Sequence, residues 1–546
     1  MRLVERRIGL LFAVFLALLT LATLRAGWLG TVRAEDLRSR ALTQQEEELV
    51  VPARRGTITD RHGVELAVSE DAITVFANPF LVKDPVGAAR KLAPLIGESE
   101  ADILEKLSDR GRGFVYLRRK LDASKGEDVE KLKLEGIGTI VEPKRRYPQD
   151  YLASQLLGTV GTDNVGLSGL EQSREEQLHG RDGRRRVVKD ALGKPVSIVE
   201  LQRGEPGEDL RLTIDSAIQE RTESVLADVG ETFRPKGATA IVVDPRNGEV
   251  LALANWPRVD ANDISGAPGY ALQDRAVMAS YEPGSTFKAI TVSGALAEHR
   301  VTPSTRFDLP PTIHVADREI GEAHARGPVN LSVAEVLAQS SNVGAVKIAQ
   351  TLGPTRFDQW VRRFGFGRTT GLDLPGEAGG IVLRPQQYSG STLGNMAIGQ
   401  GLAVTPMQMV AAYTAIANGG VLEPPHVVAG EARPPRRVLP AAVAHQVATM
   451  LEGVLAAGGT ASEAAVPGYV LAGKTGTAEK PDENGGYSED KYVASFIGFA
   501  PAQDPRLLVA VMVDEPQYVH AGGAVAAPAF EKIVSFALPY LRIPPK

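Results

Sequence analysis

The sequence contains no cysteine, and several further absences narrow the chemistry open to it. Without cysteine among its 546 residues the chain forms no disulfide, has no thiol nucleophile and builds no thiolate metal site. Its eight histidines are scattered, and neither a His-Glu-x-x-His motif nor a phosphate-binding Gly-rich loop occurs. A formal net charge of -5 argues against a nucleic-acid partner. We therefore expect no metal ion, no cofactor and no nucleic-acid ligand.

Long apolar runs are also scarce, and the one that stands out lies near the N-terminus. It extends from Ile8 to Leu24, can continue through Ala26 to Leu29, and follows Arg2, Arg6 and Arg7. This length predicts a transmembrane anchor at 8–29. The basic residues before it favour a cytoplasmic tail at 1–7 and a single-pass protein of the plasma (inner) membrane whose remainder is extracytoplasmic. A cleaved signal peptide and a buried soluble helix are the alternatives, and the length of the run favours the anchor.

The length of the chain predicts more than one folded domain after this anchor. We assign 30–50 to a stalk, whose polar part at 34–48 is expected to be helical, and 51–205 to a pedestal domain. The Gly/Pro/acidic stretch at 204–208 suits a boundary, so 206–546 forms the larger C-terminal domain. Within the pedestal we expect a strand, a Gly-containing turn and a second strand, followed by a small inserted helical subdomain.

The C-terminal domain alternates strand and helix patterns. Caps are predicted at Asp215, Ser332 and Thr405, each before a helix. Two pairs of strands are predicted, a hairpin at 238–243 and 249–254 and a second pair at 493–500 and 507–513. A final helix is predicted at 529–538, and Pro539 ends it. Strands at both ends of the domain and helices between them predict an α+β fold. Its one antiparallel sheet would combine N-terminal and C-terminal strands of the domain.

Ser285 and Lys288 form a Ser-x-x-Lys pair just after a Pro-Gly turn. The segment from Thr286 to His299 lacks proline and predicts a helix, which places both side chains on one face near its start. A helix N-terminus favours negative charge that develops on the serine. Burial would lower the pKa of the lysine, so that its neutral amine can take the serine proton. For a lone Ser-x-x-Lys pattern, a capped surface helix is still the better interpretation.

Two further motifs follow in the chain. Ser340-Ser341-Asn342 comes after a helix expected to begin at Ser332, where Glu335 completes a capping box. Lys474-Thr475-Gly476-Thr477 comes at the end of an apolar run, 469–472, that predicts a strand. Either motif alone is compatible with a plain turn. Ser-x-x-Lys, Ser-x-Asn and Lys-Thr-Gly in this order are the pattern of penicillin-binding proteins and class A β-lactamases.

On these motifs the chain resembles the class B penicillin-binding proteins, which are monofunctional, membrane-anchored peptidoglycan transpeptidases. The segment from Arg54 to Ala67 resembles the pedestal of that family, and so does Gly166-Leu167-Ser168-Gly169-Leu170-Glu171. The second segment favours the cell-division (septal) branch over the elongation branch. The resemblance covers nearly the whole chain. It implies the penicillin-recognising serine transpeptidase fold, with an antiparallel sheet flanked by helices, an elongated pedestal and one transmembrane helix.

The resemblance also implies a substrate and catalytic roles. The substrate would be a peptidoglycan stem peptide ending in D-Ala-D-Ala, and β-lactam antibiotics would acylate the same serine. Ser285 would attack the carbonyl between the two D-Ala residues, with Lys288 as its base. Ser340 would relay a proton towards the leaving amine. Asn342 would hold the substrate peptide and Lys288 in register.

The third motif would bind the terminal carboxylate of the substrate. Lys474 is expected to stay protonated and supply charge, while Thr475 and Thr477 offer hydroxyl groups. Gly476 would let the substrate approach the strand without a side chain in the way. The backbone N–H groups of Ser285 and Thr477 would form the oxyanion hole.

Several other functions fit the motifs less well. Ser341 stands where class A β-lactamases carry aspartate, and no Glu-x-x-Leu-Asn element occurs, which disfavours a hydrolase. A D,D-carboxypeptidase, an elongation-type transpeptidase and a non-catalytic penicillin-binding sensor or scaffold remain alternatives. No glycan-polymerising domain is expected, so family analogy adds a membrane polymerase and division proteins as partners.

Overall fold

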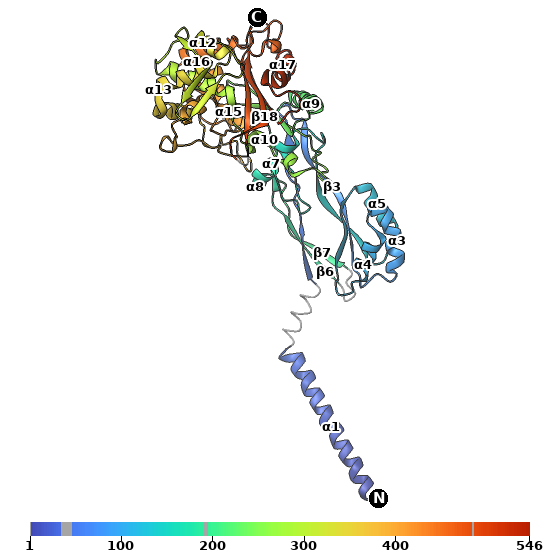
Figure 1. Cartoon of the computed structure of the whole chain (residues 1–546). Coiled ribbons are helices and arrows are strands. Elements are labelled where there is room, and N and C mark those ends of the chain that lie inside the picture. The colour runs from blue at the N-terminus through green and yellow to red at the C-terminus, as the bar shows by residue number, and fades with distance from the viewer. Residues whose placement is uncertain (1, 34–45, 190–194, 483–484, 546) are drawn as a thin grey trace. The chain divides into compact units, whose positions relative to one another are not determined.

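The computed structural model describes residues 2–33, 46–189, 195–482 and 485–545 (Figure 1). They divide into two compact units. The first comprises 1–54, 72–143 and 180–207, and the second comprises 55–71, 144–179 and 208–546. The predicted pedestal, 51–205, therefore contributes segments to both units. Its proposed boundary with the C-terminal domain stays a prediction.

The first unit begins with helix α1 (Arg2–Thr31). The part from Arg6 to Thr31 is long and apolar enough to cross a membrane, and its side chains are almost all exposed. Residues 34–45 of the predicted helical stalk lie outside the described residues. The end of that segment belongs to strand β1 (Glu46–Val51), so the prediction of a helix there is wrong. Hydrogen bonding to the neighbouring strand β6 outweighs the helical preference of the glutamates.

The rest of the first unit consists of a small sheet and the inserted subdomain. Strand β1 pairs antiparallel with β6 (Gly183–Lys189), which pairs with β7 (Pro195–Gln202). The subdomain has its own apolar core, which confirms the predicted insertion. Its elements are α3 (Pro85–Ile96), α4 (Glu100–Ser108), β4 (Val115–Leu121), α5 (Ala123–Lys131) and the first part of β5 (Ile137–Arg146).

In the second unit, the segments that precede residue 208 form short elements. Strand β2 (Ile58–Thr59) pairs with the start of β3 (Glu65–Ala77), as the strand–turn–strand prediction required. On its other side β2 pairs with β8 (Leu210–Arg211). The helices of this part are α6 (Ser154–Leu157), α7 (Gly169–Ser173) and α8 (Glu175–His179).

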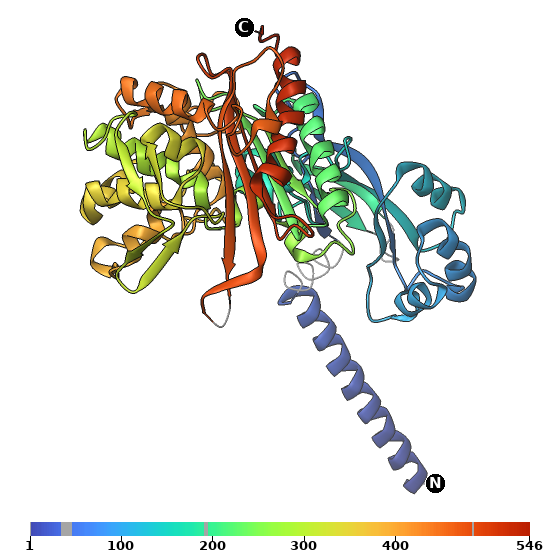
Figure 2. The same ribbon diagram turned by 45° about the horizontal axis from the view of Figure 1, so that its top comes forward.

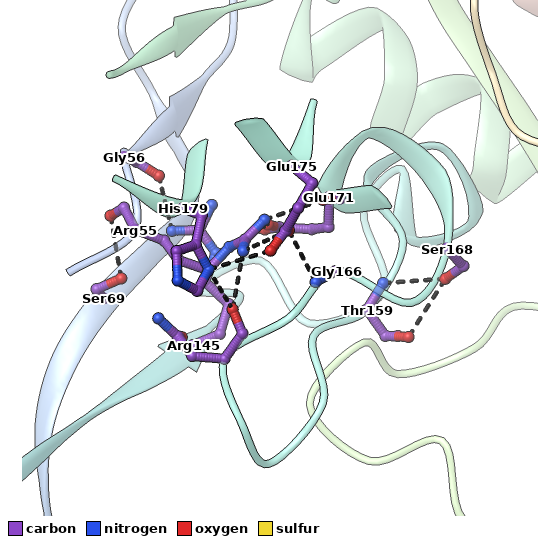
Figure 3. A network of polar contacts seen from close by, with 11 residues as sticks. Arg55, Gly56, Ser69, Arg145, Thr159, Gly166, Ser168, Glu171, Glu175 and His179 are labelled. Carbon is purple, nitrogen blue, oxygen red and sulfur yellow. Dashed lines mark hydrogen bonds and ion pairs between the residues drawn. The ribbon is translucent and has the colours of Figure 1, made fainter. Parts of the chain in front are cut away.

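A buried ion network joins these segments (Figure 3). The Glu171 carboxylate accepts hydrogen bonds from Arg55 Nε at 2.9 Å and from Arg145 Nε at 2.6 Å, and all three side chains are almost fully buried. Arg55 also donates to Glu175 at 2.7 Å. Glu171 ends the Gly-Leu-Ser-Gly-Leu-Glu segment, so this segment is tied to the chain near residue 55 by charge-assisted hydrogen bonds.

One five-stranded antiparallel sheet forms the centre of the second unit, in the order β10-β9-β19-β18-β17. Strand β9 pairs with β19, so the sheet combines N-terminal and C-terminal strands of the domain, as predicted. Most of the side chains of its inner strands are buried, which explains their nearly continuous apolar sequence. The strands are β9 (Gly237–Val243), β10 (Val250–Trp256), β17 (Ala472–Pro481), β18 (Tyr487–Ala500) and β19 (Leu507–Asp514).

Helices cover both faces of this sheet (Figures 1 and 2). Helices α9 (Ser216–Phe233) and α17 (Gly522–Tyr540) pack together on one face, and α15 (Pro406–Ala417) packs on the other. The final helix is longer than the predicted 529–538 and continues past Pro539 to Tyr540. It also includes Pro528, where packing of the buried Val525 and Phe530 on the sheet outweighs the local cost of proline.

The predicted caps are confirmed: Asp215 caps α9, Ser332 forms a capping box with Glu335, and Thr405 caps α15.

The remaining α-helices and short strands lie between residues 275 and 452. The helices are α10 (Arg275–Met278), α11 (Lys288–Ala297), α12 (Val333–Ala338), α13 (Asn342–Arg363), α14 (Thr392–Ala397) and α16 (Ala441–Glu452). The short strands are β11 (Arg306–Leu309), β12 (Thr312–Val315), β13 (Arg318–Gly321), β14 (Val329–Ser332), β15 (Val421–Leu422) and β16 (Arg436–Arg437).

Candidate active site

Ser285 lies in a single 3₁₀ turn, Gly284–Phe287, immediately before α11. The α-helix predicted from Thr286 therefore begins at Lys288. Gly284 has a φ of +54°, which favours glycine, and its N–H donates to the Gly399 carbonyl at 3.0 Å. A Cβ on Gly399 would lie 2.1 Å from the Gly284 carbonyl oxygen. The two glycines thus allow a close backbone contact that supports the serine turn.

The Lys288 side chain is fully buried and points to the Ser-x-Asn motif. Its Nζ donates to the Ser340 carbonyl at 2.6 Å, to Ser340 Oγ at 3.3 Å and to Asn342 Oδ1 at 2.6 Å. The fold thus brings together the first two motifs, which are more than fifty residues apart. Within the part of the chain that the structure describes, Ser285 Oγ makes no hydrogen bond. It is half-buried and free to meet a substrate.

The backbone at the second motif is strained. Ser340 has a φ of +59°, an unfavourable conformation for a residue with a side chain, between the end of α12 and the start of α13. Ser341 caps α13, because its Oγ accepts from the Gly344 N–H at 3.0 Å. This sharp connection turns the Ser340 carbonyl and hydroxyl towards Lys288.

Burial sets the electrostatics of Lys288. Removal from water disfavours the charged ammonium and lowers the pKa of Lys288 to about 7, while the negative charge of Glu322 acts in the opposite direction. A lysine with this pKa is partly neutral at neutral pH. The lysine beside the serine therefore has the property that proton abstraction requires.

The third motif forms the first half of edge strand β17, where Lys474 pairs in register with Ile497 of β18. The strand begins at Ala472, so the prediction that it occupies 469–472 and ends at the motif is wrong; the chain before Ala472 does not join the sheet. Thr475 Oγ1 lies 2.8 Å from Thr460 Oγ1, and Thr477 Oγ1 accepts from the Gly522 N–H at 3.0 Å.

Lys474 differs from its sequence expectation. Its side chain is fully buried, and burial together with the neighbouring Lys288 lowers its pKa well below the usual lysine value. The Lys-Thr-Gly motif carries no sign of this burial, and that Lys474 stays protonated for the substrate carboxylate stays a prediction. Lys474 Nζ contacts Thr475, at 3.2 Å from its carbonyl oxygen and 3.3 Å from its Oγ1.

Gly476 also has a different structural reason than expected. A Cβ at this position would lie 2.3 Å from Ser495 Oγ and 3.0 Å from the Pro283 carbonyl oxygen. The missing side chain therefore lets β17 pack against the serine turn, while access for substrate at Gly476 stays a prediction. The motif and the serine are held together by this close packing.

A cleft of about 520 Å³ opens over these groups. It is lined by residues of all three motifs and by three segments that the sequence did not single out, 322–326, 460–463 and 521–524. None of these segments carries a recognisable motif. The motif residues in its lining are Ser285, Ser340, Ser341, Asn342, Thr475 and Thr477.

Comparison with known proteins decides the family. Residues 238–535 match the family described as the penicillin binding protein transpeptidase domain, and residues 50–212 match the penicillin-binding protein dimerisation domain. The chain belongs to the class B penicillin-binding proteins. This confirms the predicted family and fold class, including the N-terminal domain that precedes the transpeptidase domain.

Individual relatives of this penicillin-binding protein span almost its whole length. It is 34% identical to stage V sporulation protein D of Bacillus subtilis, over 98% of this chain and 86% of that protein. It is 32% identical to the peptidoglycan D,D-transpeptidase FtsI of Escherichia coli, over 99% of this chain and 92% of that protein. The crystal structure of penicillin binding protein 3 from Mycobacterium tuberculosis, complexed with aztreonam, matches with a TM-score of 0.71 at 29% identity, covering 91% and 98% of the two chains.

Proposed function

We propose that this penicillin-binding protein is a peptidoglycan D,D-transpeptidase that joins stem peptides through an acyl-enzyme on Ser285. The observation that carries the proposal is the position of Lys288, whose buried amine has a pKa of about 7 and is held by Ser340 and Asn342 beside the cleft that Ser285 lines. At pH 7 about half of such lysines are neutral and able to accept a proton. Names of relatives support the same reaction.

We assign the acylation step to the first two motifs. Ser285 Oγ attacks the carbonyl of the penultimate D-Ala and forms the C–O bond, while its proton passes to Lys288 Nζ. The backbone N–H groups of Ser285 and Thr477 stabilise the oxyanion. The C–N bond then breaks, and the proton moves from Lys288 to the leaving D-Ala amine through Ser340 Oγ, which lies 3.3 Å from Nζ.

The substrate carboxylate is assigned to the third motif. Thr475 and Thr477 line the cleft and present hydroxyl groups to it, and the strand backbone at Gly476 lies between them. Lys474 acts on the carboxylate through Thr475, because its Nζ lies beside Thr475 Oγ1. A negative charge that enters the cleft favours the protonated form of Lys474. In the second half-reaction the amine of a neighbouring stem attacks the ester carbonyl and forms the amide C–N bond, while its proton passes to Lys288. The C–O bond to Ser285 then breaks, and Lys288 returns the proton to Ser285 Oγ.

A reconstituted reaction tests this function. The full chain in detergent would be mixed with polymerised glycan strands whose stem peptides end in D-Ala-D-Ala, and the products would be digested and analysed by mass spectrometry. We expect cross-linked muropeptides and one released D-Ala per cross-link, both lost in Ser285→Ala. Release of D-Ala without cross-links would show a D,D-carboxypeptidase instead. No release from any substrate would favour the sensor or scaffold function.

The cellular role is proposed as septal wall synthesis. The Gly-Leu-Ser-Gly-Leu-Glu segment supports the division branch. Helix α1, whose first two turns carry Arg2, Arg6 and Arg7 ahead of the apolar part, supports a single membrane pass with a cytoplasmic N-terminus. Because the transpeptidase match includes no glycan-polymerising activity, we expect a membrane polymerase and division proteins as partners. A fluorescent fusion should collect at the division site; even labelling of the lateral wall would assign the protein to elongation.

A further inference from the structure

Glu322 is a buried acid at the active site that belongs to none of the three motifs. It follows strand β13, lines the cleft, and has a side chain that is only 6% exposed. Its carboxylate accepts hydrogen bonds from Ser341 Oγ at 2.6 Å and from the Asn342 N–H at 2.7 Å. Arg326, four residues further on, pairs with the same carboxylate. Nearly complete burial of the side chain together with three hydrogen-bonding partners indicates a defined position for the carboxylate.

The contacts of Glu322 lead directly to the base. The Glu322 carboxylate accepts from the N–H of Asn342, the first residue of helix α13, where the helix dipole favours a negative charge. The side chain of Asn342 is fixed at both ends: Nδ2 donates to the Gly321 carbonyl at 2.8 Å, and Oδ1 accepts from Lys288 Nζ at 2.6 Å. Gly321 and Glu322 therefore fix the position of Asn342, and the side-chain amide of Asn342 in turn fixes Lys288.

The charges around Lys288 make this acid significant. Lys474 is a neighbour of Lys288, and the negative charge of Glu322 opposes the effect of burial on the pKa of Lys288. Arg326 partly neutralises Glu322. Two other titratable groups line the same cleft, His324 on the loop of Glu322 and the exposed Glu463 on the opposite segment.

We propose that Glu322 is a positioning residue, whose carboxylate fixes Asn342 against Lys288 and whose charge keeps Lys288 able to hold the proton taken from Ser285. This role rests on the proposed function, in which the lysine both accepts and returns that proton. Without the Glu322 carboxylate the pKa of Lys288 would be lower. Lys288 would therefore stay neutral down to a lower pH, but it would be a weaker base. Asn342 would also lose the acceptor for its N–H.

The test is the pH dependence of acylation by a fluorescent penicillin, measured on the full chain in detergent between about pH 5 and 9. In Glu322→Gln we expect the midpoint of the acid limb to fall by about one pH unit, as removal of a neighbouring opposite charge predicts. We also expect the plateau rate to fall about tenfold because the amide cannot satisfy Ser341 and Asn342 together. Glu319→Gln, on the same hairpin but exposed, should match the wild type.

The opposite change serves as a second arm. Arg326→Gln leaves the Glu322 charge uncompensated, so the midpoint should move to higher pH. A Glu322→Gln profile with a lower plateau but an unchanged midpoint would overturn the proposal, because a merely structural residue would behave in that way. If Glu322→Gln does not fold, an unchanged or lowered midpoint in Arg326→Gln would overturn it. Failure of the wild type to be acylated would instead contradict the proposed function.

Discussion

Removal of Glu171 from the buried ion network is expected to destabilise the second unit strongly (Figure 3). Glu171 is fully buried and accepts from both Arg55 and Arg145, whose side chains are 0% and 3% exposed. In Glu171→Ala, Arg55 keeps its pairing with Glu175, but Arg145 loses the carboxylate at 2.6 Å. Breaking a buried pair in this way typically costs about 3–5 kcal/mol, because a charge is left without compensation.

Glu175→Ala is the matched control for this change. Glu175 is 30% exposed, pairs with the same Arg55, and also accepts from the Gly166 N–H at 2.9 Å. Because Arg55 keeps its partner Glu171 in this variant, the loss should cost about 1 kcal/mol. The assay is urea unfolding of the full chain in detergent, followed by tryptophan fluorescence, with penicillin labelling below the transition to show that the active site is intact. A difference of at least about 2 kcal/mol between the two variants is expected. Equal unfolding free energies would refute the assignment of a dominant role to the Glu171 carboxylate.

Two further predictions concern the base and the anchor. Lys288→Arg, which keeps the charge but cannot act as a base, should lower the second-order acylation rate by about 10²–10⁴-fold, whereas Lys532→Arg on the exposed side of α17 should not change it. In the wild type this rate should rise as pH increases through about 7, because Lys288 is protonated below that pKa and neutral above it, and a flat profile would contradict its role. The Ile8–Leu29 region should remain in the mature protein, so N-terminal sequencing of membrane-extracted material that starts near Glu35 would refute the anchor.

Local signals in the sequence predicted much of the fold. The caps at Asp215 and Thr405 and the capping box of Ser332 depend on side chains next to the helix they begin, so sequence alone is enough to find them. The strands of the central sheet are apolar because both of its faces are covered, which makes them visible as runs. The order of the three motifs then predicted which segments meet.

Features set by distant contacts were not predictable. The burial of Lys474 depends on elements packed around β17, and the Lys-Thr-Gly motif itself gives no sign of it. Glu322 reaches Asn342 from a loop about twenty residues earlier, with no motif to mark it. The last helix begins at Gly522 and includes Pro528, because Val525 and Phe530 pack on the sheet against the local preference of proline. In each case tertiary contacts outweigh the local pattern.

Intact-protein mass spectrometry after exposure to penicillin tests the central claim, that Ser285 is the nucleophile, most directly. The wild type should gain the mass of one penicillin, and peptide mapping should place it on the 3₁₀ turn before α11. Ser280→Ala, an exposed serine five residues earlier, should acquire the same adduct. Ser285→Ala should acquire none, and an adduct that persists in this variant would contradict the account.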